Sequence, residues 1–415
     1  MSKNKLITSD FVVIGGGIIG INLARCLKKA FPDTKIILLE KEKDCGLHAS
    51  GRNSGVIHAG FYYTPDSLKA KFTRLGNQML TQYCEEKKIP LNKCGKLVVA
   101  KDKNDIPSLE ELLRRGKNNG VVLHELNEEE VRKLEPRAKT HQKALFSPTT
   151  SSVNPARVIE SMKNDALNEG IEIHCDVAYL KKRANGLLIT TKGQYQAAYV
   201  VNASGLYADK IAKDFKFSEN YRILPFKGIY LYSNEPAFSL SRHIYPVPDL
   251  KNPFLGVHFT VTVDGKVKIG PTAIPALWRE QYDFIKRFKI TEFTDILLRQ
   301  LGLFIFSEFD FKRLAIDEMK KYSKPHLVRL ASTLAKEVKK ENFKTFGIPG
   351  IRAQLLNTKE RKLEMDFILE GDKESMHILN AVSPAFTSSL PFAEYVCDKI
   401  KALVNNRISE IKKLT

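Results

Sequence analysis

The chain has 415 residues, a length at which one hydrophobic core usually gives way to two domains with a cleft between them. Its apolar content excludes a disordered or fibrous protein, and its six cysteines lack the spacing of a zinc site or a disulfide framework. The 66 Lys and Arg residues against 47 Asp and Glu residues give a net charge of +19, which attracts anions in general but names no partner.

The first predicted elements form a βαβ unit. An apolar strand is expected at 10–14, a helix at 18–30 and a second strand at 35–40. The first strand and the helix are joined by Gly15-Gly16-Gly17-Ile18-Ile19-Gly20. This spacing, in this context, predicts a dinucleotide-binding turn.

The glycines of this turn and the acid that follows it each have a physical role. Gly15 permits the tight turn, Gly17 lets the backbone approach a pyrophosphate, and Gly20 lets the helix pack closely on the sheet. The helix N-terminus offers free N–H groups to the phosphates. Glu40 ends the second strand, where it can bind ribose hydroxyls, and an acid there disfavours the 2′-phosphate of NADP. The turn by itself does not distinguish NAD from FAD as the bound dinucleotide.

The later elements predict an α/β protein of two domains. Further helices are expected at 67–88, within 108–135, at 154–170, within 291–345 and from about 385, and strands at 94–100, 171–179, 187–191, 195–202, 366–369 and 376–379, with a mostly β layer at 221–271. We expect a discontinuous Rossmann-like nucleotide-binding domain of residues 1–80, 150–215 and 346–415. Residues 81–149 and 216–345 form the expected substrate domain, a mixed β-sheet with helices.

A second loop, at residues 48–60, is dense in small residues and holds His48 and His58. Its glycines and hydroxyls would let the ribityl chain and ring of a flavin lie against backbone. An ordinary polar loop has the same composition, so both interpretations stay open on this loop alone.

The same region resembles the L-2-hydroxyglutarate dehydrogenase/oxidase family of FAD enzymes, within the D-amino-acid-oxidase-like superfamily. The similar segments are Ser50-Gly51-Arg52-Asn53-Ser54-Gly55-Val56-Ile57-His58-Ala59-Gly60-Phe61-Tyr62-Tyr63, then 67–71, 245–249, 254–260, Gly270-Pro271, 350–354 and 380–387. They span almost the whole chain in the expected order and are thinnest between about 280 and 345.

The resemblance implies FAD as the cofactor and no metal. Its AMP half is expected on the N-terminal turn, with Val177 at the adenine, 203–205 at the pyrophosphate and 380–387 at the pyrimidine edge of the ring. A helix N-terminus after that last loop would stabilise negative charge on the reduced ring. The cofactor-binding residues implied are Gly15, Gly17, Ile18, Ile19, Gly20, Glu40, Lys41, Ser50, Arg52, Asn53, Ser54, Val177, Ala203, Gly205, Asn380, Ser383 and Thr387.

The resemblance also implies catalytic roles. His258 is expected to take the hydroxyl proton of the substrate while a hydride goes to flavin N5, although a histidine in a strand is often structural. His58 competes for this role. Arg352 is expected to bind the substrate carboxylate, with an exposed surface arginine as the alternative, and Tyr245 to contact the substrate.

A dicarboxylate needs a second donor, for which the candidates are Lys227, Arg52, Arg242 and Arg279. The chain departs from the family pattern near the expected substrate: Arg52 replaces a frequent His, Ile229 a frequent Glu, and Thr272 a usual Asn, while Trp278 takes an often basic position. Oxidation of a small L-2-hydroxy acid is therefore expected, with L-2-hydroxyglutarate, giving 2-oxoglutarate, as the first candidate. Another hydroxy acid, an amino acid or glycerol 3-phosphate is the alternative.

The electron acceptor is expected to be a quinone or oxygen. The aromatic stretch 301–311 beside basic helices is typical of contact with an anionic membrane, although a core segment has the same pattern. The short polar N-terminus predicts no signal peptide, and no run reaches the roughly 20 apolar residues of a spanning helix. We expect a cytoplasmic protein, at most peripheral on the inner membrane, with no specific nucleic-acid partner.

Overall fold

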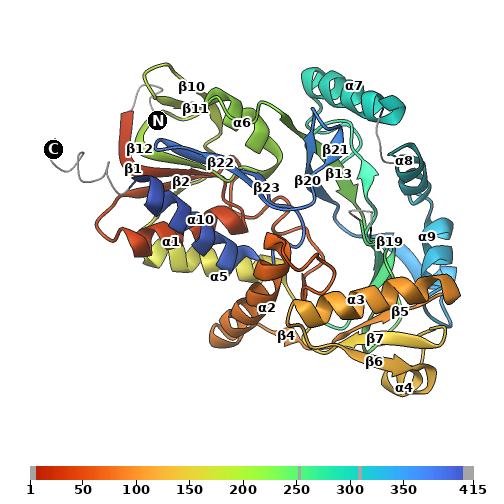
Figure 1. Cartoon of the computed structure of the whole chain (residues 1–415). Helices are drawn as coiled ribbons and strands as arrows, with labels where there is room; N and C mark the ends of the chain where they lie inside the picture. The colour runs from red at the N-terminus through yellow and green to blue at the C-terminus, as the bar shows by residue number, and fades with distance from the viewer. Residues whose placement is uncertain (1–5, 251–253, 307–310, 405–415) are drawn as a thin grey trace.

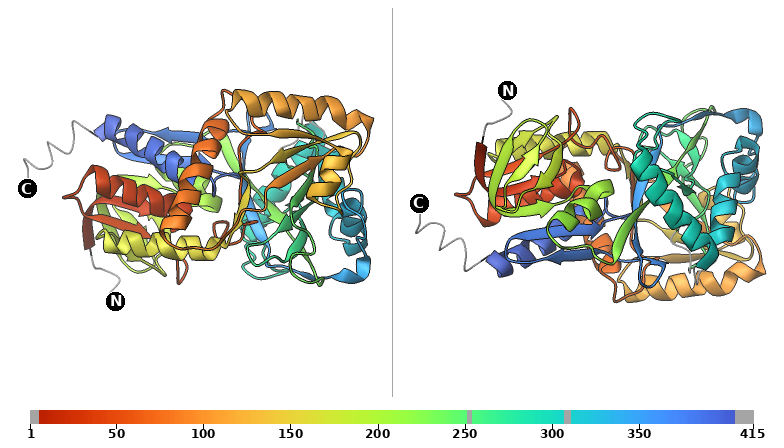
Figure 2. Two further views of the ribbon diagram at one scale, coloured as in Figure 1. Left: turned by 90° about the horizontal axis from the view of Figure 1, so that it is seen from below. Right: turned by 90° about the horizontal axis from the view of Figure 1, so that it is seen from above.

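The first lobe is built on a parallel sheet. The computed structural model describes residues 6–250, 254–306 and 311–404 and divides them into two lobes (Figures 1 and 2). The strand order in the first lobe is β10 (Tyr179–Lys182), β11 (Leu188–Thr190), β12 (Gln194–Asn202), β1 (Leu6–Ile14), β2 (Ile36–Leu39) and β9 (Glu172–His174), with β23 (Ser375–Asn380) paired to β12 and to β22 (Ile368–Gly371). β1 runs parallel to both β2 and β12, which explains the continuous apolar runs of these buried strands.

Helices cover one face of this sheet. Figure 1 shows α1 (Ile18–Ala30), α5 (Pro155–Asn168) and α10 (Ser389–Val404) beneath it, and α2 (Leu68–Glu86) packs against α10. α6 (Ala208–Asp214) packs against β10, β12 and β23. Ile21, Leu23 and Leu27 of α1 are fully buried in the core that joins these helices to the sheet.

The second lobe holds a larger mixed sheet. Its order is β19 (Phe343–Phe346), β14 (Leu231–Ser233), β17 (Val267–Gly270), β16 (His258–Val261), β15 (His243–Pro246), β5 (Lys96–Val99), β7 (Lys143–Ser147) and β6 (His124–Asn127). Two smaller sheets join the lobes: β18 (Ile274–Pro275), β13 (Tyr221–Gly228), β20 (Gly350–Asn357) and β21 (Lys362–Leu363), and β3 (Val56–Ile57), β8 (Ser151–Val153) and β4 (Leu91–Asn92). The helices of this lobe are α3 (Ile106–Asn118), α4 (Glu128–Leu134), α7 (Ile290–Phe306), α8 (Phe311–Lys320) and α9 (Lys324–Ala331).

The central strands of the larger sheet have two different faces. Leu97, Ile244 and Phe259 lie in an apolar core with Leu327 of α9. Side chains alternate along a strand, so their neighbours in sequence point to the other face. That face carries buried polar and charged side chains on β5, β15, β16 and β17: Lys96, His243, Tyr245, His258, Thr260 and Lys268.

The predicted α/β class is confirmed, and the structure corrects several element bounds. The region 108–135 contains a strand, β6, between α3 and α4, and 171–179 is divided between β9 and a loop before β10. The last helix begins at Ser389, because 383–388 form turns. β20 and β21 pair with β13 rather than with the first sheet, so we propose that the last piece of the nucleotide-binding domain begins near β22 instead of residue 346.

The stretch 301–311 is divided between burial and exposure. Leu303 and Phe311 are buried, whereas Phe304 and Ile305 are exposed on α7, and residues 307–310 lie outside the described part of the chain. Of the helices that the structure describes, none has the length and apolar character needed to cross a membrane.

Candidate active site

A cavity of about 910 Å³ runs between the two lobes. Its volume is within the range of about 300–1,000 Å³ that is usual for ligand pockets. The predicted residues that line it are Gly15, Gly17, Ile18, Ile19, Glu40, Lys41, Ser50, Arg52, Asn53, Ser54, His58, Val177, Ala203, Gly205, Tyr245, His258, Arg352, Ser383 and Thr387. Residues from distant parts of the sequence therefore meet in one space.

The glycine-rich turn forms one end of the cavity. Gly15 has φ +115°, and a Cβ atom there would lie 2.5 Å from the carbonyl oxygen of Ala203. A Cβ at Gly20 would lie 1.9 Å from the carbonyl oxygen of Gly15. Gly20 is thus required for helix packing and does not reach the cavity wall. The N-terminus of α1 at Ile18 and Ile19 borders the cavity, where its amides suit phosphate groups.

Glu40 is held beside this turn by two backbone amides. Its Oε2 accepts a hydrogen bond from Gly16 N at 2.8 Å, and its Oε1 accepts one from Glu42 N at 2.9 Å. Burial raises the pKa of Glu40, and the two N–H donors oppose that rise. A carboxylate has further lone pairs, so ribose hydroxyls can still bind to it from the cavity.

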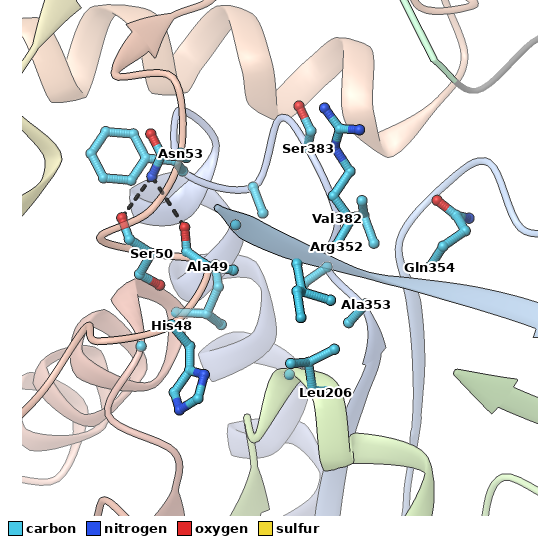
Figure 3. Close-up of a pocket in the computed structure, with 18 of the residues that line it drawn as sticks. His48, Ala49, Ser50, Asn53, Leu206, Arg352, Ala353, Gln354, Val382 and Ser383 are labelled. Carbon is cyan, nitrogen blue, oxygen red and sulfur yellow. Dashed lines mark hydrogen bonds between the residues drawn. The ribbon is translucent and has the colours of Figure 1, made fainter. Parts of the chain in front are cut away.

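The second loop is tied to both neighbouring elements. Ser50 Oγ accepts a hydrogen bond from Ile18 N at 3.0 Å, and Asn53 Nδ2 donates to Ser50 O at 2.6 Å. His58 N donates to Thr387 Oγ1 at 3.1 Å. Figure 3 shows this loop facing β20, which carries Arg352. The loop therefore links the nucleotide turn to the segment before α10.

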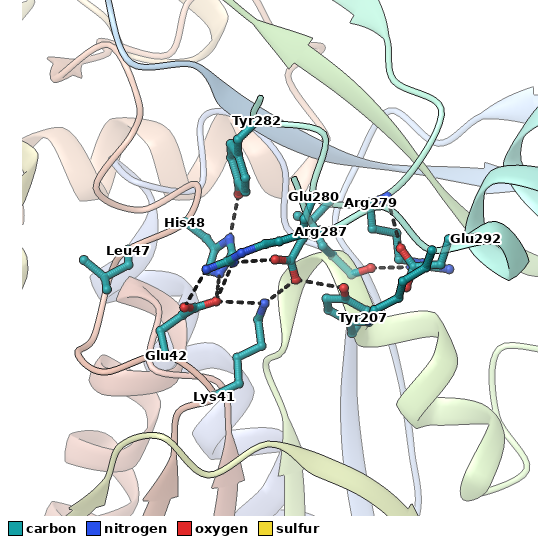
Figure 4. A network of polar contacts seen from close by, with 12 residues as sticks. Lys41, Glu42, Leu47, His48, Tyr207, Arg279, Glu280, Tyr282, Arg287 and Glu292 are labelled. Atoms are coloured by element: carbon teal, nitrogen blue, oxygen red, sulfur yellow. Dashed lines mark hydrogen bonds and ion pairs between the residues drawn. The ribbon is translucent and has the colours of Figure 1, made fainter. Parts of the chain in front are cut away.

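An ion-pair network closes the cavity at the β2 side (Figure 4). Lys41 pairs with Glu280 and, at 3.1 Å, with Glu42, so this predicted cofactor contact is already held by carboxylates. Arg287 bridges the same two acids. Burial raises the pKa of Glu280, but the positive charges of Lys41 and Arg287 outweigh this effect. Together they lower the pKa of Glu280 to about 2. His48 joins the network through Glu42 at 2.9 Å, which anchors the second loop.

These features fit an extended adenine dinucleotide. The turn brings backbone within reach of a pyrophosphate, Glu40 borders the cavity, and Val177 lines it near the expected adenine. The cavity continues past His58 to the polar face of the larger sheet. A flavin ring attached to such a dinucleotide would therefore meet the substrate lobe.

His258 projects from β16 into the far end of the cavity. Its Nδ1 donates to the carbonyl oxygen of Gly256 at 3.0 Å, because that oxygen can only accept. Nε2 of the neutral ring is then the unprotonated nitrogen. The ring stacks on Tyr245, with 3.6 Å between centroids and 17° between planes. Burial places the pKa of His258 well below its usual value, so the ring is neutral near pH 7.

His58 lines the same cavity and is also neutral. Burial places its pKa well below the usual value, and Lys96 adds to this effect. Arg352 contributes a cation: its guanidinium lies 5.6 Å from the Phe254 ring centroid and donates to Thr272 O at 3.2 Å. In the described part of the chain, no carboxylate lies within 4 Å of the Arg352 guanidinium. A small acid entering the cavity would thus find a cation free to bind it.

The structure places several predicted residues away from the cavity wall. Lys227 pairs with Ile351 across β13 and β20, so its side chain is on the opposite face of that sheet from Arg352. Asn380 donates to Glu364 O and Asp366 O and holds that loop. Arg279 is buried in a bidentate ion pair with Asp209, and Arg242 donates to Cys94 O at 3.0 Å and does not line the cavity. Of the four candidates for a second cation, Arg52 alone lines the cavity.

Two lysines were missed by the reasoning from sequence. Lys69 on α2 lines the cavity, and burial lowers its pKa to about 8. Lys96 on β5 lies directly behind the wall and is fully buried. The segments His243-Ile244-Tyr245 and His258-Phe259-Thr260-Val261 alternate between polar and apolar positions, so the two-residue strand period would have revealed a polar face there, whereas Lys96-Leu97-Val98-Val99 does not alternate.

Comparison with known proteins identifies the family. Residues 10–396 match the family described as FAD dependent oxidoreductases. An L-2-hydroxyglutarate dehydrogenase of Escherichia coli strain K12 is 35% identical over 95% of this chain and 94% of its own length. The mitochondrial L-2-hydroxyglutarate dehydrogenase of Homo sapiens is 35% identical over 94% of this chain and 88% of its own.

Solved structures show the same fold. An L-alpha-glycerophosphate oxidase from Mycoplasma pneumoniae with FAD bound has a TM-score of 0.74 at 21% identity, over 96% of this chain and 95% of that chain. A glycine oxidase from Geobacillus kaustophilus has a TM-score of 0.71 at 17% identity, over 95% of both chains. FAD is the cofactor of the matched family. The chain therefore belongs to the FAD-dependent oxidoreductases, in the family of the L-2-hydroxyglutarate dehydrogenases.

Proposed function

We propose that the protein oxidises L-2-hydroxyglutarate to 2-oxoglutarate. The observation that carries this proposal is the meeting, in one cavity beside the dinucleotide turn, of the Arg352 guanidinium, which has no ion pair among the described residues, and an unprotonated histidine nitrogen. Relatives named for this activity match nearly the whole chain, which supports the same substrate class. Bound FAD supplies the two-electron acceptor for the hydride that leaves the substrate carbon.

The residues of the chain bind the acid and move its proton. Arg352 suits the carboxylate next to the reacting carbon, because a guanidinium donates two parallel hydrogen bonds to a carboxylate. Nε2 of His258 accepts the proton of the hydroxyl group as the C–H pair departs and the C=O bond forms. The hydrogen bond from Nδ1 to Gly256 fixes the ring in the required tautomer.

We assign the second carboxylate to Arg52. Its guanidinium lies 4.3 Å from the Tyr282 ring centroid, and its Nε donates to Leu47 O at 2.7 Å, so the side chain is held in place. A Cβ at Gly350 would lie 2.4 Å from the carbonyl oxygen of Arg52, which brings the second loop against the strand of Arg352. Arg52 thus lines the cavity, its backbone lies against the strand of Arg352, and its guanidinium lies over Tyr282, whose hydroxyl contacts His48.

A substrate screen tests the proposal. Under anaerobic conditions, L-2-hydroxyglutarate should bleach the visible absorbance of the bound FAD. D-2-Hydroxyglutarate, glycine and glycerol 3-phosphate should leave this absorbance unchanged. L-2-Hydroxypentanoate has the same chain without the distal carboxylate and should react far more slowly. Bleaching by glycine or glycerol 3-phosphate, with none by L-2-hydroxyglutarate, would reject the assignment in favour of an alternative substrate.

Arg52→Gln tests the second carboxylate. It should reduce kcat/KM for L-2-hydroxyglutarate by about 10-fold or more, which is the loss of a charged hydrogen bond, and change that for L-2-hydroxypentanoate little. Equal losses with both acids would instead assign Arg52 to cofactor binding.

We also propose that electrons pass to a quinone at an anionic membrane surface. Phe284 and Ile285 are 90% and 71% exposed, and Leu298 and Ile305 of α7 are exposed as well. Lys286 is exposed between them in sequence. Apolar side chains interleaved with cations suit an interface of acidic lipids.

Flotation with liposomes checks the membrane proposal. The protein should float with vesicles of phosphatidylglycerol at low salt and not with neutral vesicles. Phe284→Ser combined with Ile285→Ser should abolish flotation, and Val122→Ser, at another exposed apolar site, should not. A soluble quinone should then reoxidise the reduced enzyme faster than oxygen does; faster reoxidation by oxygen would make the protein an oxidase.

A further inference from the structure

Lys96 lies in an aromatic cage directly behind the cavity wall. Its Nζ is 4.5 Å from the ring centroid of Tyr62, 4.6 Å from that of Phe61 and 4.8 Å from that of Tyr245. The side chain is fully buried, and Nζ has no hydrogen-bond partner. No carboxylate of the described residues lies within 4 Å of it. A buried ammonium is normally paired, so a fold that keeps this one unpaired invites a functional explanation.

The cage holds the charge only in part. Aromatic faces attract a cation, but they replace water incompletely. Burial accordingly lowers the pKa of Lys96 to about 7. The side chain is therefore positively charged at acidic pH and partly charged near pH 7.

The groups around Lys96 are basic, phenolic or, in one case, a thiol. The titratable groups that surround the cage and His258 are His58 after β3, Tyr62 and Tyr63 from the following loop, Cys94 before β5, Tyr230 before β14, His243 and Tyr245 from β15, and Lys268 from β17. Lys96 lies directly opposite His243 in the register of β5 and β15. Two residues along β15, Tyr245 covers the cage on one side and stacks on His258 on the other.

Lys96 affects His258 in two ways, one of them through the Tyr245 ring. The cage fixes the Tyr245 ring, and that ring fixes the His258 imidazole. The charge of Lys96 also lowers the pKa of both His58 and His258. Without a compensating cation, two substrate carboxylates would raise the pKa of a nearby histidine and so protonate the group that must accept the hydroxyl proton.

Resting on the proposed function, we propose that Lys96 is a positioning residue for the oxidation of the dicarboxylate. From behind the Tyr245 ring, its ammonium holds the His258 imidazole in place and keeps Nε2 unprotonated while the dianion is bound. Lys96 touches neither substrate nor cofactor, since it does not line the cavity. Its effect on the protonation of His258 is electrostatic, so that effect follows the charge and not the shape of the side chain.

The test compares Lys96→Met, which keeps an apolar stem without the charge, with Lys96→Arg, which keeps the charge. Lys101→Met removes an exposed lysine shortly after β5 and serves as the control. The readout is an NMR pH titration of ¹³Cε1-labelled histidine in the FAD-loaded protein, with the His258 signal assigned by its loss in His258→Asn. In the wild type and in Lys101→Met, the ring should titrate well below the ordinary range of a histidine.

In Lys96→Met, the His258 titration should move up by about one pH unit, and binding of 2-oxoglutarate should move it further. In Lys96→Arg it should stay within a few tenths of the wild-type value. The acid limb of the flavin-reduction rate should shift with the NMR titration in each variant. A His258 titration that Lys96→Met leaves unchanged, or a wild-type His258 that titrates near pH 6.5, overturns the proposal.

Equal loss of rate in the Met and Arg variants without any shift would also overturn it, because that result describes packing alone. If Lys96→Met does not fold, Lys96→Gln is compared in its place, and the wild-type titration still decides. The NMR readout needs no turnover. A shifted titration together with no reduction by L-2-hydroxyglutarate would therefore reject the substrate and leave the role of Lys96 intact.

Discussion

Gly16 donates its backbone N–H to the Glu40 carboxylate at 2.8 Å, across 24 positions of sequence. The contact joins the glycine-rich turn to the end of β2, so the same carboxylate fixes the turn and borders the cavity, where we propose that it binds the ribose. The two halves of the nucleotide site are thereby one unit, and damage to either should appear as loss of cofactor.

Glu40→Gln should weaken FAD binding by about 10-fold, because the amide keeps an acceptor oxygen but loses the charge and the second acceptor. Glu40→Ala should weaken it further. Titration of the apoprotein with FAD, followed by flavin fluorescence, measures this, with the exposed Glu341→Gln as the control. Unchanged affinity in both Glu40 variants would exclude the ribose role.

The two histidines should separate in their effects. His258→Asn should retain FAD and slow flavin reduction by about 10²-fold to 10⁴-fold, the usual contribution of a general base. His58→Asn should slow it much less, because we assign proton transfer to Nε2 of His258. Stopped-flow reduction at saturating substrate gives both rates. The reverse order would make His58 the base.

Arg352→Met should raise KM for L-2-hydroxyglutarate and lower kcat/KM by about 10-fold to 100-fold, since a charged hydrogen-bonded contact contributes about 1.5–3 kcal/mol. Arg352→Lys should recover only part of this loss, because an ammonium cannot donate in bidentate fashion. Steady-state kinetics with FAD content as a control checks both. A variant with normal KM would place the substrate carboxylate elsewhere.

The pH profile of kcat/KM should lack a limb near pH 6.5. The base must be unprotonated, and burial places the pKa of His258 well below its ordinary value. The rate should therefore be flat through pH 6 and fall only at lower pH, where Nε2 takes up a proton. A fall centred between pH 6 and 7 would show that the base has an ordinary pKa.

Stability should fall on the acid side because of buried histidines. Burial lowers the pKa of His377 to about 4, while the unfolded chain keeps a value of about 6.5. Between these two pKa values, His377 is mostly protonated in the unfolded chain and mostly neutral in the folded protein. The unfolding free energy should therefore drop as pH falls from about 6.5 to 4, by up to about 1.4 kcal/mol per unit for this group.

His377→Gln should flatten the acid-side fall in thermal midpoint, measured with excess FAD, whatever its effect at neutral pH. The exposed His124→Gln is the matched control and should leave the slope unchanged. If the thermal midpoint fell equally steeply with pH in the wild type and in His377→Gln, His377 would not be a source of the acid instability.

Most residues that line the cavity, including His258, Tyr245 and Arg352, could be predicted from sequence, whereas most candidates for the second cation were misplaced. The turn at Gly15 and the acid at Glu40 are local patterns whose spacing is fixed by a βαβ unit. Lys227 seemed a substrate contact because it is basic and near in sequence, but its register opposite Ile351 turns it away from Arg352. Register between distant strands has no local sequence signal.

Lys96 was missed for a related reason. Its proposed role depends on the rings of Phe61 and Tyr62, which follow the second loop, and of Tyr245 on β15, and no single segment shows that arrangement. The alternation of polar and apolar residues along β15 and β16 indicates a polar face, but Lys96-Leu97-Val98-Val99 of β5 does not alternate, so the sequence could not place Lys96 on that face. Tertiary packing supplied that information.

The central claim is that this cavity oxidises the dicarboxylate itself. The most direct measurement is anaerobic titration of the FAD-loaded enzyme with L-2-hydroxyglutarate, with the flavin absorbance and the 2-oxoglutarate formed followed together. We predict full bleaching with one molecule of 2-oxoglutarate produced for each flavin reduced. A flavin that stays oxidised in excess L-2-hydroxyglutarate would contradict the claim.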